Sequence, residues 1–273
     1  MAYNNVIDIV RKVVSQAREF YAEGSHSVDR SFKDCADAGY NPLFMPELAQ
    51  ARTDADKESR LWEVWFGTPS IRATGKTRHG KPVVVYGHVP NYFSNPANVA
   101  KAIDDGKLVN GAGIMPQDEF YSLLDQEGNG RVFVVDHDTL RKSTSGVIKV
   151  DEALAHPQTV PFLGGQENAE RYLAAHKKAY GNRIGVWHRD DLGDEARGRV
   201  LFVGCCKDGL IGFYLDFFCG RVVGVAPEAH SVAKNLDPKL EARVAGALSE
   251  KRAFEHNGTL YVPVRDSRVK VVE

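Results

Sequence analysis

The chain has 273 residues, of which 43% are hydrophobic, and its 35 basic and 36 acidic residues give a formal net charge of −1. This length predicts one large domain or two modest ones, and it is enough to bury a core without disulfides. The balanced charge gives no global field that would attract nucleic acid or an anionic membrane surface, so we expect neither as a partner.

The cysteines and the first residues bear on the compartment. The chain contains no Cys-x-x-Cys pair, and its cysteines are typical of buried thiols in a reducing compartment. Asp8, Arg11 and Lys12 interrupt the first apolar stretch, so we expect neither a signal peptide nor a membrane span. We therefore predict a cytoplasmic protein. The cysteines are Cys35, Cys205, Cys206 and Cys219.

The N-terminal part is predicted to be helical. Apolar residues at three- and four-residue spacing predict a helix over about 4–22, and a short second helix is expected over 29–38. The stretch 39–60 has two prolines and many charges, which indicates irregular or weakly helical structure. Three strands should follow, with residues 78–81 as the turn between the last two. These strands are LWEVWF, SIRATGKT and PVVVYGHV, between 61 and 89.

The middle of the chain alternates helices and strands. Asn95 and Pro96 predict a helix start, with the helix running to Asp105 and ending at Gly106. Two further helices and two strands are expected from the periodicity of the apolar residues. The helices span 116–127 and the segment GGQENAERYLAAHKKAYG at 164–181, with Gly181 beyond the helix end, and the strands are RVFVVD at 131–136 and SGVIKV at 145–150.

Residues 183–226 form a run of apolar segments rich in β-branched and aromatic residues. The links between them are about ten, four and two residues long. A parallel connection needs roughly a dozen residues or more, so the short links predict antiparallel pairing. Beyond this run, Asp237 and Pro238 predict a helix over 238–250. Asn257-Gly258 is a strong hairpin signal that joins FEH to TLYVPV.

Together these elements predict an α+β fold with a mixed, largely antiparallel sheet and flanking helices. If the chain has two parts, the boundary lies near 106–116. The N-terminal part at 1–110 would then hold helices and a β-hairpin, and an α+β region with an antiparallel meander would occupy 111–273. One continuous domain is the alternative.

Histidines end three of the predicted strands, and these are the main candidate for chemistry. Imidazole and carboxylate are ligands of Zn, Mn and Fe(II), and metal-bound water is a nucleophile near neutral pH. One hypothesis is therefore a metal site of His88, His137, His188 and Asp191, with Asp136, Asp138 and Asp190 as catalytic carboxylates. Because antiparallel neighbours end at opposite edges of a sheet, the histidines could equally be separate surface or core residues.

Two other motifs give weaker evidence for a function. The sequence ATGKT at 73–77 lacks the first glycine and the following helix of a phosphate-binding P-loop. Tyr92 and Phe93 could form a recognition loop, although they could equally fill the core beneath it.

One series of segments recurs in a known order. It contains a Pro-led helix, a strand leading into a short helix, and a meander whose turn holds Asp208, and it spans about 115–226, under half of the chain. These pieces are MPQDEF, LLDQEGNG, VIKVDEAL, RVLFVG, Lys207-Asp208-Gly209, GFYLDFF, Gly220 and RVVGV. Together they resemble SUKH domains. The resemblance implies a partner-binding module, of the kind that acts as an immunity protein, with its sheet as the contact surface.

We therefore take a non-catalytic protein-binding module, without a cofactor, as the first hypothesis. Its partner would be another protein, with Tyr92, Phe93 and Asp208 as possible contact residues. The alternative is a metal-dependent hydrolase that uses the histidines and aspartates at the strand ends.

Overall fold

The computed structural model describes residues 17–212, 214–227, 254–256, 259–264 and 267–271. The chain divides into two units, one of residues 18–224 and one of residues 1–17 with 225–273. The boundary predicted near 106–116 falls inside the first unit. The helix predicted over 238–250 lies outside the described residues. Residues 4–16 of the helix predicted over 4–22 also lie outside them.

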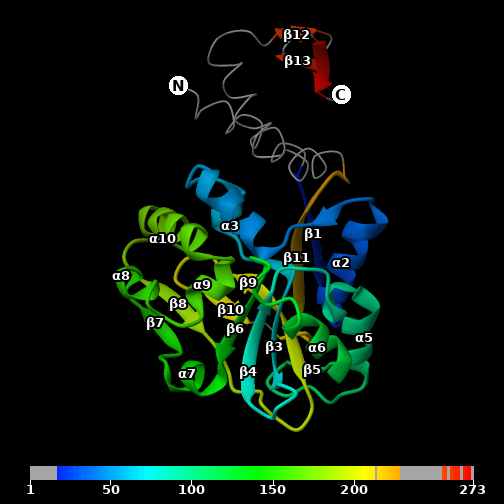
Figure 1. Ribbon diagram of the computed structural model, residues 1–273, viewed down its shortest axis with the longest axis vertical. Helices are drawn as coiled ribbons and strands as arrows, with labels where there is room; N and C mark the ends of the chain where they lie inside the picture. The colour runs from blue at the N-terminus through cyan, green and yellow to red at the C-terminus, as the bar shows by residue number, and fades with distance from the viewer. Residues whose placement is uncertain (1–16, 213, 228–253, 257–258, 265–266, 272–273) are drawn as a thin grey trace. The chain divides into compact units, whose positions relative to one another are not determined.

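A large sheet runs through the first unit (Figure 1). Its eleven strands in the described part of the chain are β1 (Ala17–Glu23), β2 (Asn41–Pro42), β3 (Phe66–Lys76), β4 (Pro82–Gly87), β5 (Gly113–Ile114), β6 (Val132–Asp136), β7 (Gly146–Ile148), β8 (Ile184–Trp187), β9 (Arg197–Val203), β10 (Leu210–Gly212) and β11 (Cys219–Val225).

The sheet is mixed. Its main path runs β1-β11-β3-β9-β10-β8-β7, and β4 continues from β3 to β6. The sheet contains antiparallel ladders, but β8 pairs with β10 in parallel, and so does β3 with β11. The α+β class and the mixed character of the sheet are confirmed, and the expectation that the sheet is largely antiparallel is corrected. Within 183–226, the antiparallel pairing of β9 with β10 is confirmed. The pairing predicted for the other consecutive strands was wrong, because β8 lies beyond β10 and pairs with it in parallel, and β11 lies beside β3.

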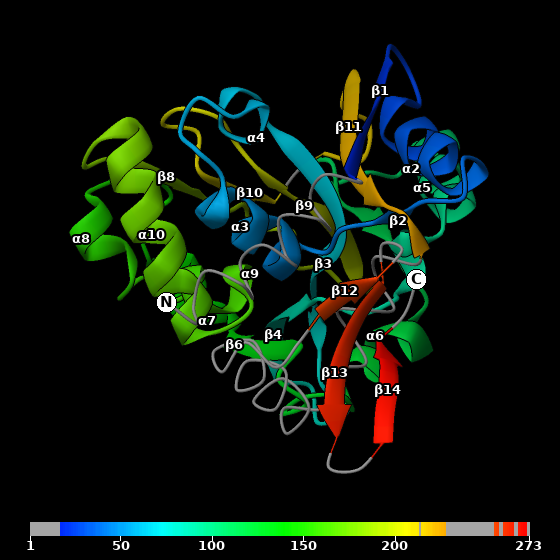
Figure 2. The ribbon, with the colours of Figure 1, turned by 90° about the horizontal axis from the view of Figure 1, so that it is seen from above.

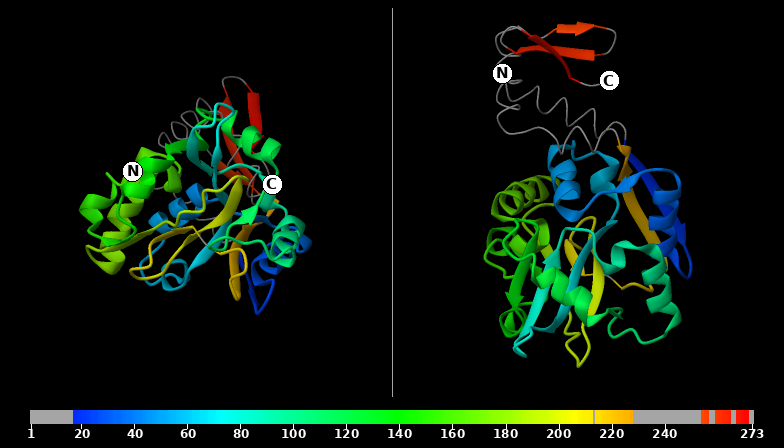
Figure 3. Two further views of the ribbon diagram at one scale, coloured as in Figure 1. Left: turned by 90° about the horizontal axis from the view of Figure 1, so that it is seen from below. Right: turned by 45° about the vertical axis from the view of Figure 1, so that its right-hand side comes forward.

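Helices flank the sheet on two sides (Figures 1 and 3). Helix α10 packs against α3 and α9 on one side, and α2 packs against α5 on the other. The view from above separates the same two groups (Figure 2). The helices are α2 (Ser27–Asp37), α3 (Met45–Asp54), α4 (Arg60–Glu63), α5 (Pro96–Asp104), α6 (Gln117–Leu124), α7 (His137–Lys142), α8 (Val150–Ala153), α9 (Thr159–Leu163) and α10 (Gln166–Tyr180), with the 3₁₀ turn η1 (Tyr92–Ser94).

The predicted helix ends are confirmed where capping residues define them. The Asn95 side chain accepts a hydrogen bond from Ala97 N at 3.0 Å, with Pro96 in the first turn of α5. Helix α10 ends at Gly181, whose φ of 85° favours glycine. In the described residues, no helix is both long and apolar enough to cross a membrane.

Two predicted elements in the N-terminal part were wrong. Residues 17–22 belong to strand β1, in which only Phe20 is buried. This strand neighbours β11, about two hundred residues later, and long-range pairing has overridden the helical spacing. The segment LWEVWF begins in helix α4, because Ser59 accepts a hydrogen bond from Leu61 N at 3.3 Å and so caps a helix there.

The core of the first unit lies along β3 and β9. Between Thr68 and Ile71 the register of β3 against β9 shifts, so that Pro69 and Ser70 bulge out of the ladder. The Ser70 hydroxyl accepts a hydrogen bond from Met45 N at 2.8 Å, which ties α3 to the bulge. Buried core residues around the two strands include Phe32, Ile71, Val85, Phe93, Val99, Phe120, Val200 and Phe202.

The cysteines only partly follow the expectation of buried thiols. All four are free, and Cys35 is fully buried, which raises its pKa to about 12. Cys206 is exposed, while Cys205 and Cys219 are partly exposed.

The second unit contains a three-stranded antiparallel sheet within its described residues. Its strands are β12 (Phe254–His256), β13 (Thr259–Val264) and β14 (Ser267–Val271). His256 pairs with Thr259 across the hairpin, which confirms the pairing predicted from Asn257-Gly258.

Candidate functional site

A loop of residues 188–196 joins β8 to β9 and separates two cavities. Residues 188–190 line a cavity of about 230 Å³ beside α7, here called the α7 cavity. Residues 194–196 line a second cavity of about 410 Å³ beside α5, here called the α5 cavity. The loop is therefore the structural element that the two cavities share.

The centre of this loop is fixed by a buried ion cluster. Arg72 of β3 and Arg199 of β9 pair directly across the sheet, and like charges in that position repel each other. Asp191 lies between them and accepts hydrogen bonds from Arg72 Nη1 at 2.9 Å and from Arg199 Nη2 at 3.0 Å. The Thr74 hydroxyl donates a third, at 2.9 Å. All three charged side chains are at most 2% exposed.

The ionisation of Asp191 follows from these neighbours. Burial alone would raise the pKa of the carboxyl group, and the charges of Arg72 and Arg199 more than offset it, so the pKa lies below its ordinary value. Asp191 is therefore a carboxylate at neutral pH. Two arginines against one carboxylate leave this buried cluster with an excess positive charge.

Hydrogen bonds tie the loop to residues 107–112. Asn110 Nδ2 donates to the Asp190 carbonyl at 2.8 Å, and Arg197 Nη1 donates to the Lys107 carbonyl at 2.8 Å. Asn110 has a φ of 49°, in the region that asparagine tolerates better than most residues. The two loops consequently hold each other's backbone in place.

A third segment completes this arrangement. Leu215 N donates to the Gly111 carbonyl at 2.9 Å, and a Cβ at Gly111 would lie only 1.9 Å from Tyr214 Cδ1. Only glycine fits this approach. The Arg189 guanidinium lies over the Tyr214 ring, 5.6 Å from its centroid, which links the segment back to the 188–196 loop.

The α7 cavity brings together two of the predicted histidines. His137 Nε2 lies 3.0 Å from Asp190 Oδ1, and His188 lines the same cavity. Asp190 has a lowered pKa, because hydrogen bonds from Leu192 N and His137 outweigh its partial burial. The lining residues are Arg72, His137, Leu140, Arg141, Ser143, Ser145, His188, Arg189 and Asp190.

His188 is held as a neutral ring. Burial, aided by the charge of Arg72, lowers its pKa to about 4. Its backbone N–H donates to the Ser145 hydroxyl at 3.1 Å, and Ser143 Oγ lies 3.2 Å from its Nε2. The Ser143 hydroxyl donates to the Leu140 carbonyl at 2.7 Å, so His188 Nε2 is placed as the donor to Ser143. This polarity is the reverse of a histidine base that activates a serine nucleophile.

His88 is not part of this group. It is buried directly after β4, with Nδ1 3.0 Å from the Ser70 hydroxyl and Nε2 2.8 Å from the Pro161 carbonyl. Burial lowers its pKa to about 3. Both ring nitrogens are therefore engaged in holding the β3 bulge against α9.

The predicted carboxylates serve separate structural roles. The Asp136 side chain caps α7 by accepting from Thr139 N at 2.9 Å, and exposed Asp138 accepts from Arg141 Nε at 3.3 Å. Within the described residues, no group of three or more His, Cys, Asp or Glu side chains is placed to hold a metal ion. The hypothesis of a shared site of His88, His137, His188 and Asp191 is thereby corrected, because His88 and Asp191 each have other partners.

The three residues considered for partner contact lie in different parts of the structure. Phe93 is fully buried in the core, so the alternative that it fills the space beneath its loop is the one observed. Tyr92 is partly exposed and lines the α5 cavity. Asp208 is exposed in the turn between β9 and β10, where its N–H donates to the Cys205 carbonyl at 3.1 Å.

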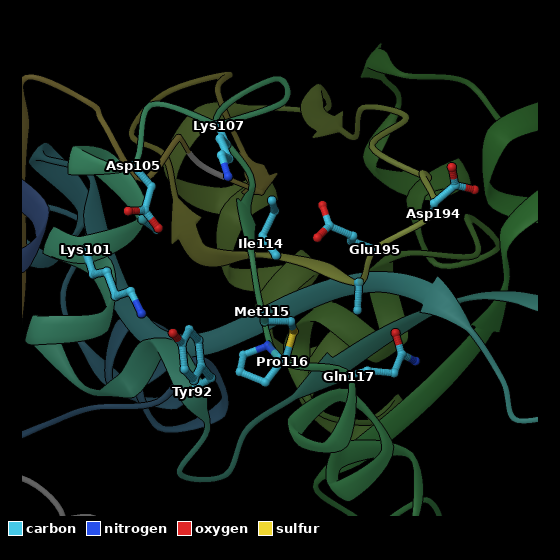
Figure 4. Close-up of a pocket in the computed structure, with 12 residues that line it drawn as sticks. Tyr92, Lys101, Asp105, Lys107, Ile114, Met115, Pro116, Gln117, Asp194 and Glu195 are labelled. Carbon is cyan, nitrogen blue, oxygen red and sulfur yellow. The ribbon is translucent and has the colours of Figure 1, made fainter.

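The α5 cavity carries charges of both signs (Figure 4). Tyr92 and Lys101 lie on one side of it, and Asp194 and Glu195 on the other, with Met115 and Pro116 between them. Asp194 is fully exposed and has Lys76 Nζ at 3.5 Å. This cavity therefore offers an apolar floor with a polar, exposed rim.

Sequence reasoning identified His137, His188 and Asp190 but missed Arg72, Arg199 and Asn110. The two arginines left a signal, since each is a charged residue inside a predicted strand segment, Arg72 in SIRAT and Arg199 in RGRVLF. Their joint role depends on the register of β3 against β9 and on a carboxylate from a distant loop.

Comparisons with known proteins place the fold. No family model matches the chain, and no curated protein does. A solved structure from work on the accommodation of massive sequence variation in Nanoarchaeota by the C-type lectin fold is 52% identical, with a TM-score of 0.72. The match covers 77% of this chain and 97% of that one. None of these comparisons bears on the resemblance to SUKH domains, which stays a prediction. At this identity and coverage, the chain belongs to the family of that C-type lectin fold protein.

Proposed function

We propose that the chain is a non-catalytic binding module whose partner is another protein. The contact surface would be the exposed residues on and beside the 188–196 loop, here called the loop surface. The observation that carries the proposal is the buried Arg72–Asp191–Arg199 cluster, which fixes the middle of a loop whose flanking side chains are exposed. The loop surface consists of Trp187, Arg189, Asp190, Asp194 and Glu195.

A fixed loop with exposed side chains suits recognition. Binding a preorganised loop avoids the entropy cost of ordering it on association. Trp187 is 38% exposed, and Arg189, two residues further along the chain, is also exposed. Tryptophan and arginine are enriched among the residues that dominate interface energies. The loop surface thus combines an aromatic anchor with a charged group on a rigid support.

The relative supports the same interpretation. Its C-type lectin fold is described as accommodating massive sequence variation. In this chain, Asp191 and its two arginines hold the loop from inside, so exchanges at Arg189, Asp194 or Glu195 leave the anchor intact. Separating the anchor from the exposed positions is what a binding surface needs in order to change specificity without unfolding. The proposal needs no cofactor, and the cytoplasmic location remains part of it.

The experiment is capture followed by reconstitution. The full chain is immobilised, bound proteins are identified by mass spectrometry, and each candidate is purified and titrated by calorimetry. We expect Trp187→Ala and Arg189→Ala to weaken binding at least tenfold. Tyr21→Ala and Arg171→Ala, an exposed aromatic and an exposed arginine that line neither cavity, serve as matched controls. Equal affinity for the loop-surface variants and the wild type would refute the proposal.

A further inference from the structure

We propose that the α7 cavity binds an oxyanion, a carboxylate or phosphate group presented by the partner. This inference rests on the proposed function and names the chemistry of one part of its contact surface. It follows from the side chains that line the cavity, from their charges and from the volume of the cavity.

Most side chains that line the cavity carry N–H or O–H groups. Three arginines, two histidines and two serines line it, and Leu140 is its one apolar lining residue among those described. The two hydroxyl protons are already used, because Ser143 donates to the Leu140 carbonyl and Ser145 to the His188 carbonyl. The single lining carboxylate, Asp190, has His137 Nε2 at 3.0 Å and Leu192 N at 3.1 Å from its Oδ1. The donors left for an incoming oxyanion are therefore the guanidinium groups of Arg141 and Arg189.

The charges around the cavity favour an anion. Arg189 is exposed, and among the described residues its guanidinium has the Tyr214 ring as neighbour and no carboxylate within ion-pair distance. Arg141 is half exposed and opposed by Asp138 at 3.3 Å. Behind them, Arg72 shares the one carboxylate of Asp191 with Arg199. Arg189 is thus the guanidinium with the most unused hydrogen-bonding capacity.

The geometry of the arginine guanidinium groups indicates which class of ligand the cavity would bind. Arginine presents a planar fork of N–H groups that matches the two oxygens of a carboxylate or phosphate. The neutral His188 ring and the Ser143 and Ser145 hydroxyls add polar groups without adding charge. At about 230 Å³ the cavity is smaller than the roughly 300–1,000 Å³ of pockets for drug-sized molecules. It therefore suits the charged end of a side chain better than a whole cofactor.

The test uses the full chain and small probes. Sodium acetate and inorganic phosphate are titrated separately at constant ionic strength, with sodium chloride as the reference salt, and backbone and imidazole NMR signals are followed. We expect saturable shifts at His137, His188 and Arg189 that chloride does not produce. Saturation by acetate indicates that the partner presents a carboxylate group. Saturation by phosphate alone indicates that the partner presents a phosphate group.

Variants assign the response to the cavity. Arg141→Gln/Arg189→Gln should weaken the anion response at least tenfold, Arg189→Lys should retain part of it, and Arg171→Gln should leave it unchanged. Matching thermal unfolding curves show that the variants are folded. Absence of a saturable response, or an equal response in the double variant, would overturn the inference. These results are measured without the partner, so the two failures are distinguishable. A cavity that fails to bind anions leaves the proposed function standing, whereas anion binding in a chain that captures no partner leaves the anion site standing and refutes its presentation by a partner.

Discussion

Asp191 Oδ1 and Oδ2 accept hydrogen bonds from Arg72 Nη1 at 2.9 and 3.2 Å, although the two residues are 119 positions apart in the chain. Arg72 Nη2 also donates to the Arg189 carbonyl at 2.9 Å, so one guanidinium holds both the carboxylate and the backbone of the loop. The conformation of the loop surface therefore depends on a residue in the middle of the central sheet.

Asp191→Asn should destabilise the first unit strongly. The exchange leaves Arg72 and Arg199 buried without a carboxylate, and losing one partner of a buried ion pair costs about 3–5 kcal/mol. The free energy of unfolding, from urea titration at pH 7, checks this. Asp125→Asn breaks an exposed pair with Arg78 and should cost less than about 1 kcal/mol. Similar losses for the two variants would show that Asp191 does not anchor the loop.

Gly111→Ala should lower the stability of the folded chain clearly more than Gly106→Ala does. Both glycines have positive φ, 77° and 63°, so alanine at either position is strained by roughly 1–2 kcal/mol. At Gly106 the added Cβ meets no atom within 4 Å, whereas at Gly111 it would overlap Tyr214. The difference between the two melting temperatures measures how tightly the loops pack. Equal melting temperatures would mean that the Gly111–Tyr214 approach is not rigid.

The stability of the chain should fall as the pH is lowered from about 6.5. Burial lowers the pKa of His88 to about 3, so the unfolded chain takes up a proton near pH 6.5 that the folded chain does not bind. Stability from this group is complete above pH 6.5 and decreases down to about pH 3. At 1.36 kcal/mol per pKa unit, His88 contributes about 2 kcal/mol less at pH 5 than at pH 7.

Urea midpoints at pH 7 and pH 5 test this dependence. His176 and His188, whose pKa values are lowered to about 4 mainly by burial, add to the same slope. His88→Gln should be less stable at pH 7 and should lose less stability between the two pH values. An unchanged slope in this variant would contradict the assigned pKa of His88.

Local sequence signals predicted those elements whose ends are set by neighbouring residues. The hairpin turn at 78–81, the start of α5 at Pro96 and the end of α10 at Gly181 depend on residues within a few positions. Strand β1 and the parallel pairing of β8 with β10 depend on partners brought from elsewhere in the chain. Spacing and link length do not contain that information.

The candidate site was predicted in part for the same reason. His137, His188 and Asp190 follow strands whose ends do meet at the α7 cavity. His88 ends a similar strand, yet Ser70 and Pro161 hold it in the interior. Asp191 resembled a ligand in the sequence, and only the pairing of β3 with β9 places two arginines beside it.

Site-specific photocrosslinking tests the central claim most directly. A photoreactive phenylalanine derivative is introduced at position 194, which is fully exposed in the loop surface, and, as a matched control, at position 171 on α10. The chain is irradiated with the partner identified by capture. We predict a crosslink to the partner from position 194 and none from position 171, with both chains unfolding at the wild-type temperature. A crosslink from position 171 with none from position 194 would contradict a binding surface around the 188–196 loop.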